Sequence, residues 1–480
     1  MYRHSHPVMV LTQLQRFVFI LIIPAARGFF SALFGDFWAW LTGAWVDVGA
    51  LLLIVLLAVW RWRRLTYRLD AHGITLRSGL FARRETFLFW DNIATVTTAQ
   101  PFYLRPFHVV YLRADTLGGS SRRTDLALYV TQRESRAFLR GQDVPIPCAP
   151  APQPVYAPGT VPVLLMALLT SRSLTEVLYL STFVSQAGKL LGAEFSRLLL
   201  SSLWDISHRL AFGIPPLAAA IAYVLLGGWA LGLLFTLVRY RHYTVAQHGA
   251  VAHIHSGGIT RRQYALQLPA VNFIDIRRNI ALYALKLHSL YISVPGFGKG
   301  RDEIACLLPA EPPARFTTLL RQFFPAFVPL APTVRPARSS VLSFLGLPLF
   351  LCTLLLALAA VAVRLFAAFQ GFILFICLML LVPAALFLAL RFLAWRTGGV
   401  SFADAHYTLC YSSIFILHTV VVPASKITAL RLYQSPFQLL SGRNCHLVFY
   451  TMSEKRTRHM CRSLPRAQAE ALLQAWRAQS

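Results

Sequence analysis

Charged residues are scarce in this 480-residue chain, and acidic residues are the scarcest of them. Only 14% of the residues are charged, against about a quarter in soluble globular proteins. By contrast, 56% are hydrophobic, and the mean hydropathy is +0.54. The chain has 19 acidic residues against 46 basic ones, and only five of the basic residues are lysines. This shortage of charge argues against an ordinary soluble domain and indicates a large lipid-facing surface.

Cysteine and catalytic motifs are lacking as well. Seven cysteines are scattered without any C-x-x-C spacing, which argues against a disulfide framework or a structural zinc site. The chain has no H-E-x-x-H, P-loop or G-x-S-x-G motif, and its few acidic residues form no obvious carboxylate pair. His253 and His255 would share one face of a strand, but no third ligand lies near them. We therefore predict no metal, no cofactor and no enzymatic activity.

The basic excess gives a net charge of +27, which suits either nucleic-acid binding or retention at the cytoplasmic face of a membrane. The position of the arginines decides between these two interpretations. They cluster where apolar runs end, at residues 61–64, 239–241 and 391–396. We therefore predict a membrane protein with no nucleic-acid partner.

Apolar stretches of about 20 residues are long enough to cross a bilayer. The clearest cover residues 17–40, 42–60, 211–238, 341–366 and 371–395. A further stretch at 174–200 is interrupted by charged residues, so it is either a span or an amphipathic helix lying in the membrane interface. If the basic segments between these stretches share the cytoplasm, the chain crosses twice between residues 150 and 240. We therefore predict six spans in three hairpins, with five spans as the alternative, and an uncleaved first span.

A repeat lies between the hairpins. Its three copies can be aligned on Gly79, Gly257 and Ser413. An apolar patch begins 14 residues after each anchor, and a polar residue follows 21 residues after it. The patches begin at Ile93, Val271 and Ile427, and the polar residues are Gln100, Arg278 and Gln434. Alternating apolar residues predict short antiparallel strands, and each copy closes with a helical stretch, at 132–139, 313–323 and 465–476.

This pattern resembles the bacterial PH-like domain of the YdbS/YdbT-type membrane proteins, in particular their larger, three-module members. The resemblance implies a split β-barrel of about seven strands with a C-terminal helix. The predicted fold is thus an α+β membrane protein in which paired transmembrane helices alternate with three small PH-like split β-barrels. The predicted hairpins cover residues 1–64, 160–240 and 341–396, and the predicted PH-like domains cover 65–145, 241–330 and 397–478. The third copy departs from the pattern, because Leu417 and His418 replace the paired arginines of the other two.

Because PH-like folds are more often interaction platforms than enzymes, we expect a scaffold in the bacterial plasma membrane with its PH-like domains in the cytoplasm. The expected partners are membrane lipid and a membrane protein, such as a smaller PH-like protein. The paired arginines Arg83, Arg84, Arg261 and Arg262 are the candidate contacts for anionic lipid or a partner, with a solvated strand end as the alternative. A transporter or export accessory subunit is the competing function, supported by the number of spans and by Arg27.

Overall fold

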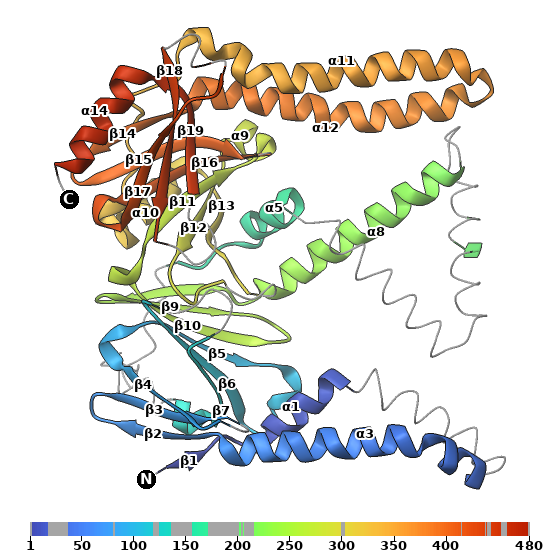
Figure 1. Cartoon of the computed structure of the whole chain (residues 1–480), viewed down its shortest axis with the longest axis vertical. Helices are drawn as coiled ribbons and strands as arrows, with labels where there is room; N and C mark the ends of the chain where they lie inside the picture. The colour runs from blue at the N-terminus through green and yellow to red at the C-terminus, as the bar shows by residue number, and fades with distance from the viewer. Residues whose placement is uncertain are drawn as a thin grey trace. The chain divides into compact units, whose positions relative to one another are not determined.

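A computed structural model describes most of the chain (Figure 1). The described residues are 2–17, 37–79, 82–118, 124–135, 156–170, 201–202, 205, 216–298, 303–413, 415–436, 438, 443–452 and 458–478. The chain divides into two compact units, Met1–Val155 with His242–Ala270, and Tyr156–Arg241 with Val271–Ser480. The second repeat is therefore divided between the two units, although the sequence predicts it as one domain.

The first unit begins with a sheet of four antiparallel strands in the order β1-β2-β3-β4. Their bounds are Arg3–His4, Thr66–Asp70, Gly73–Ser78 and Arg84–Phe89. Helices α1 (Val8–Phe17) and α3 (Phe37–Arg64) belong to the same unit. Alternate residues of the strands are apolar and bury against the second half of the repeat, in a core that includes Ile74, Ile93 and Leu112.

The second sheet of this unit joins two repeats. It has six strands in the order β7-β6-β5-β10-β9-β8 (Figure 1). The first repeat supplies β5 (Ile93–Gln100), β6 (Val109–Thr116) and β7 (Leu126–Thr131). The second repeat supplies β8 (Thr244–His248), β9 (Val251–Ser256) and β10 (Arg261–Gln267). Strands β5 and β10 pair antiparallel from Gln100 opposite Arg261 to Thr95 opposite Leu266.

The second unit repeats this arrangement one step further along the chain. Its six-stranded sheet has the order β13-β12-β11-β16-β15-β14. The second repeat supplies β11 (Phe273–Arg278), β12 (His288–Ser293) and β13 (Cys306–Glu311), with the short helix α9 (Ile280–Ala284) after β11. The third repeat supplies β14 (Gly399–Ala403), β15 (His406–Ser413) and β16 (Ile416–Pro423). Strands β11 and β16 pair from Arg278 opposite Leu417 to Ile274 opposite Val421.

The two junctions, β5·β10 and β11·β16, have the same register. In each, the residue four positions after one repeat's anchor lies opposite the residue 21 positions after the preceding anchor: Arg261 opposite Gln100, and Leu417 opposite Arg278. The three predicted PH-like domains are therefore not separate barrels. The third strand of one repeat continues the sheet begun by the fourth strand of the preceding repeat.

The last three strands form a sheet of their own in the order β17-β18-β19. Their bounds are Ile427–Tyr433, Asn444–Thr451 and Arg458–Pro465, and helix α14 (Arg466–Arg477) follows. Buried side chains from both sheets of this repeat share one core, which Ala469 of α14 enters and Leu472 and Trp476 partly cover. Each repeat thus has six strands within the described residues, against about seven implied by the resemblance.

The glycine anchors of the first two repeats are required by the backbone. Gly79 and Gly257 have φ angles of +124° and +102°, a region that L side chains rarely adopt. A Cβ atom at either position would approach the carbonyl oxygen three residues further on, in Ala82 or Thr260, to 1.9 Å. Each glycine therefore permits the tight turn into β4 or β10. In the third repeat Ser413 instead ends strand β15.

The apolar helices include one hairpin of two long helices, α11 (Val341–Leu365) and α12 (Gln370–Thr397). Within the described residues, two helices are long and apolar enough to cross a membrane, and they are these two with short extensions. Helices α5 (Thr160–Thr170) and α8 (Pro216–Arg239) precede the second repeat. Residues 18–36 and 171–200, where two further spans are predicted, lie outside the described residues, so the six-span arrangement stays a prediction.

The closing helices follow the strands of each repeat. Helix α10 (Pro313–Phe323) ends the second repeat and buries Phe316, Leu319, Leu320 and Phe323, which is the amphipathic pattern expected from their spacing. Helix α14 ends the third repeat. After β7, residues 132–135 are helical, and the rest of the predicted helix at 132–139 lies outside the described residues.

Candidate functional site at the base of the last hairpin

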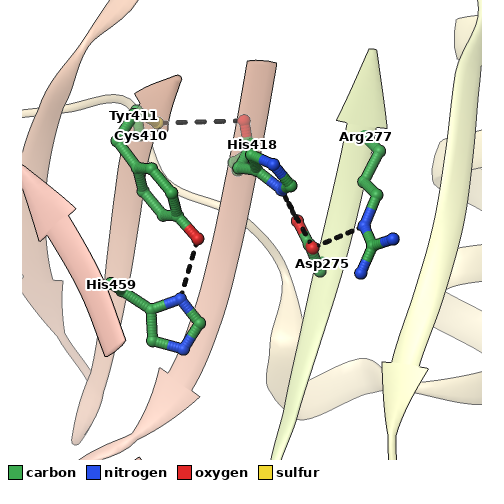
Figure 2. Close-up of polar contacts among 7 residues, drawn as sticks. Asp275, Arg277, Cys410, Tyr411, His418 and His459 are labelled. Carbon is green, nitrogen blue, oxygen red and sulfur yellow. Dashed lines mark hydrogen bonds and ion pairs between the residues drawn. The ribbon is translucent and has the colours of Figure 1, made fainter. Parts of the chain in front are cut away.

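A buried carboxylate contacts a histidine across the junction between the second and third repeats and forms an ion pair with an arginine of its own strand (Figure 2). His418 of β16 places its Nδ1 atom 2.9 Å from Oδ1 and 3.0 Å from Oδ2 of Asp275 on β11. The Nε atom of Arg277, two residues along β11, lies 2.7 Å from the same carboxylate. Asp275 and His418 are almost completely buried. The carboxylate therefore accepts hydrogen bonds from both strands and fixes how they align.

The electrostatics of this group keep Asp275 ionised. Burial by itself raises the pKa of a carboxyl group, but His418 and Arg277 outweigh it and hold the pKa of Asp275 well below its usual range. Burial likewise lowers the pKa of Arg277, and the Asp275 carboxylate more than restores it. Asp275 and Arg277 therefore remain charged at neutral pH. Their contact on β16 is His418, which occupies the position held by Arg84 and Arg262 in the first two repeats.

The network extends from the junction into the last sheet. The ring of Tyr411 stacks on His418 with centroids 5.1 Å apart and planes 14° apart. The Tyr411 hydroxyl lies 2.8 Å from Nδ1 of His459, whose Nε2 is 3.1 Å from the hydroxyl of Thr451. Figure 2 shows the Tyr411 hydroxyl pointing to the ring of His459, beside Asp275 and His418. These contacts connect β11, β15 and β16 to β18 and β19 through polar side chains.

A cavity of about 300 Å³ opens beside this network, at the end of helix α12. Three arginines line it: Arg278 from β11, Arg335 from the segment before α11, and Arg396 from the last turn of α12. The other lining side chains include Tyr411 and His418, and no carboxylate is among them. The full lining is Arg278, Pro332, Arg335, Ala394, Arg396, Thr397, Cys410, Tyr411, Leu417, His418 and Thr419. Such a cavity favours an anion of headgroup size.

Two further arginines, Arg391 of α12 and Arg462 of β19, lie close to the same end of α12. The guanidinium of Arg391 is buried, donates to the hydroxyl of Ser412 at 2.9 Å and covers the ring of Phe344 at 5.1 Å. Among the described residues, the structure gives it no carboxylate partner. Arg391 and Arg462 line one small hollow, and burial together with Arg458 lowers the pKa of Arg462. The base of the hairpin therefore has a strong positive potential.

The arginines predicted from the sequence lie elsewhere. Arg83 and Arg84 are exposed at the start of β4, and Arg261 and Arg262 are the first residues of β10. They belong to the first unit, whereas every residue lining the cavity belongs to the second. The structure therefore does not bring them into the cavity. Their contact with lipid or a partner stays a prediction.

The two histidines considered as metal ligands lie on β9. Burial, together with His248 and His255, lowers the pKa of His253 to about 4, so its ring is neutral at pH 7. Among the residues that the structure describes, no three histidine, cysteine, aspartate or glutamate side chains gather as metal ligands would. His253 instead packs edge-to-face against His248, with centroids 5.8 Å apart.

Neither the cavity nor the contact between His418 and Asp275 could be predicted from the sequence. In the sequence, Arg396 indicates the cytoplasmic end of a span, and nothing there shows that Arg278 and Arg335 lie beside it. His418 was noted only as a departure from the repeat pattern. Its partner, Asp275, lies 143 residues away, and no local pattern predicts that β11 and β16 are neighbours.

Comparison with known proteins agrees with the repeat. The model of the family described as "Bacterial PH domain" matches three segments, residues 18–145, 198–323 and 343–479, which together cover most of the chain. The chain belongs to the bacterial PH domain family. It is also similar to the UPF0699 transmembrane protein YdbT of Bacillus subtilis, with 22% identity over 305 residues. That alignment covers 59% of this chain and 61% of the relative.

These comparisons confirm the resemblance inferred from the three anchors. The similar protein is named as a transmembrane protein, and neither comparison indicates a catalytic role. PH domains in general bind lipids or proteins, which agrees with the chemistry of the cavity but does not identify its ligand.

Proposed function

We propose that this bacterial PH domain protein is a non-enzymatic, multi-pass scaffold of the plasma membrane. Its three PH-like repeats would lie at the cytoplasmic surface, and the cavity at the base of the α11–α12 hairpin would bind an anionic lipid headgroup. The observation that carries this proposal is the grouping of Arg278, Arg335 and Arg396 around one cavity without a carboxylate. The cavity lies where the apolar helices end, which is the level of the lipid headgroups.

The distribution of arginine supports the proposed orientation. The end of the hairpin next to the cavity carries Arg335, Arg338, Arg391 and Arg396, whereas the turn between the helices follows Arg364. Lysine and arginine near the ends of spans favour the cytoplasmic side. The cavity would therefore face the cytoplasmic leaflet, whose lipids supply phosphate groups.

The test compares lipid retention by the native chain and by a variant with Arg335→Gln and Arg396→Gln. Each arginine near the surface contributes about 1 kcal/mol to binding of an anionic headgroup, so the double variant should lose about 2 kcal/mol, roughly 30-fold in affinity. The protein would be reconstituted in nanodiscs of phosphatidylcholine mixed with phosphatidylglycerol. The retained lipid would then be measured by native mass spectrometry after transfer to mild detergent.

Arg338→Gln provides a matched control, since Arg338 lies in the same segment but does not line the cavity. We expect this variant to retain phosphatidylglycerol as the native chain does. Equal loss in the control and the double variant would mean that general surface charge binds the lipid, and the cavity would then have no special role. Loss only when Arg83, Arg84, Arg261 and Arg262 are changed to Ala would place the lipid contact at the paired arginines instead.

A further inference from the structure

Two strand edges of the kinds that pair at the junctions have no partner strand within the described residues, one on the first repeat and one on the last. Both junctions pair the third strand of one repeat with the fourth strand of the preceding repeat. Strand β4 is the third strand of the first repeat and ends its sheet, and β17 is the fourth strand of the last repeat and ends its sheet. In the described part of the chain, neither edge has a further strand. The array therefore exposes one edge of each kind.

The residues on β4 are exposed where their counterparts in the junctions are buried. Phe87 is 42% exposed, whereas Ala265 and Val421, at the same distance from their anchors, are 8% and 0% exposed. Phe89 is also exposed and packs edge-to-face on Phe87, with centroids 4.8 Å apart. The two phenylalanines form an apolar patch along an edge strand that contains no proline, which is unusual for an edge that has no partner.

Strand β17 shows the same contrast. Arg431 is exposed, whereas its counterparts Thr97 and Asp275 are each only 1% exposed because a third strand covers them. Leu430 and Leu432 are partly exposed, although the positions that correspond to them are buried in β5 and β11. Strand β17 therefore corresponds to β5 and β11, but within the described residues it lacks the neighbouring strand that buries them.

From these complementary edges we infer that β17 of one molecule binds β4 of a second copy of the same chain. The pairing would be a third junction, antiparallel and in the register of the other two. That register places Phe87 opposite Leu430, Arg84 opposite Tyr433 and Glu85 opposite Leu432. No like charges lie directly opposite each other, and the Phe87–Leu430 and Arg84–Tyr433 pairs are of kinds that stabilise antiparallel sheets.

This contact joins two different surfaces, so it is heterologous, and a dimer keeps one free edge of each kind. Repetition then gives a ring if the rotation closes and an open row if it does not. A second copy is the occupant to which we commit, since each molecule carries both complementary edges. The inference uses only the junction geometry and does not depend on lipid binding at the cavity.

Disulfide trapping tests this register directly. Two differently tagged chains would be co-expressed, one with Phe87→Cys and the other with Leu430→Cys, and isolated membranes would be treated with a mild oxidant. Directly opposed residues on paired antiparallel strands have Cβ atoms about 4.5–5.5 Å apart, so a small local adjustment brings two cysteines there into disulfide range. We expect a product that carries both tags and is reversed by reductant. Each single variant co-expressed with the native chain accounts for disulfides formed through the native cysteines.

The matched control replaces Leu430→Cys by Arg431→Cys, the neighbouring position on the opposite face of β17. Because one residue along a strand reverses the side-chain direction, we expect at least about tenfold less product from this pair. Equal yields from the two pairs, or no product from either, would overturn the proposed register.

A second measurement does not depend on oxidation. In mild detergent the native chain should give a series of dimers and larger oligomers, and Phe87→Asp, at an exposed position outside the core, should reduce it to monomers while leaving circular dichroism unchanged. A native chain that stays monomeric at every concentration would overturn the inference. A photo-crosslinking residue in place of Arg431 would identify the neighbour in cells. Products with β4 of this chain support the inference, whereas products with a different protein overturn the assignment to a second copy.

Discussion

Removal of the Asp275 carboxylate should loosen the β11·β16 junction more than any other single polar substitution there. Asp275→Ala would remove the carboxylate that the buried His418 ring contacts and deprive Arg277 of its ion pair. Breaking a buried ion pair from one side typically costs 3–5 kcal/mol. Because about a third of the Arg277 side chain is exposed and water can solvate it, we expect the lower end, about 3 kcal/mol.

Hydrogen–deuterium exchange measures this loss locally, without assuming that the whole membrane protein unfolds in two states. About 3 kcal/mol corresponds to exchange roughly a hundredfold faster, and we expect it in peptides from β11 and β16. Peptides from α11 and α12 should keep their native rates. Asp404→Asn is the matched control, since Asp404 is an exposed carboxylate of the same repeat with a positive φ angle that asparagine tolerates.

A double variant separates the charge from the packing. If the cost arises from the lost contact between Asp275 and His418, then the combination of Asp275→Ala with His418→Leu should be less destabilised than the sum of the two single variants. Exchange in β11 and β16 that changes by less than about threefold in Asp275→Ala would refute the reasoning, since a buried pair of this kind is worth far more than that.

Three other predictions test the rest of the fold. Gly257→Ala should destabilise the chain by about 2 kcal/mol or more in thermal unfolding, whereas Gly249→Ala, where a Cβ meets nothing within 4 Å, should cost about 1 kcal/mol. Equal costs would contradict the steric argument. Burial lowers the pKa of both His253 and His288 from 6.5 to about 4, so the unfolded chain binds more protons between these values. The stability contributed by their neutral rings is complete above about pH 6.5 and is lost as the pH falls toward 4; a melting temperature that is level across this window would contradict it. Leu320→Ala in α10 should cost 2–5 kcal/mol through the cavity it leaves, and Arg321→Ala, on the exposed face, should cost far less.

The parts of the fold that the sequence analysis predicted are those set by local patterns. The anchors Gly79 and Gly257 marked the tight turns because only glycine fits their backbone angles. The helical stretch predicted at 313–323 is helix α10, whose buried residues Phe316, Leu319, Leu320 and Phe323 lie three and four apart and so share one helical face. Long apolar runs likewise predicted α11 and α12, since length and hydropathy are read directly from the sequence.

The pairing between repeats could not be predicted in this way. Strands β5 and β11 have the alternation of ordinary barrel strands, and no property of one strand specifies which repeat supplies its neighbour. The choice depends on which edges meet in space, and these edges come from segments more than 100 residues apart, as Asp275 and His418 show. The cavity was missed for the same reason, since Arg278, Arg335 and Arg396 come together only after β11 joins β16.

The shared sheets also explain why the third repeat departs from the pattern of the first two. At the first junction, Arg262 of β10 lies opposite Ala99, a small residue. At the second junction, the corresponding position holds His418 opposite Arg277 and beside Asp275. An arginine at residue 418 would place two guanidinium groups directly opposite each other in a buried site, whereas a histidine pairs with the carboxylate and stacks on Tyr411. The loss of the arginine pair in the third repeat is therefore a consequence of joining it to the second. It follows that the paired arginines of the first two repeats should be tested as a property of those repeats and not of the PH-like fold as such.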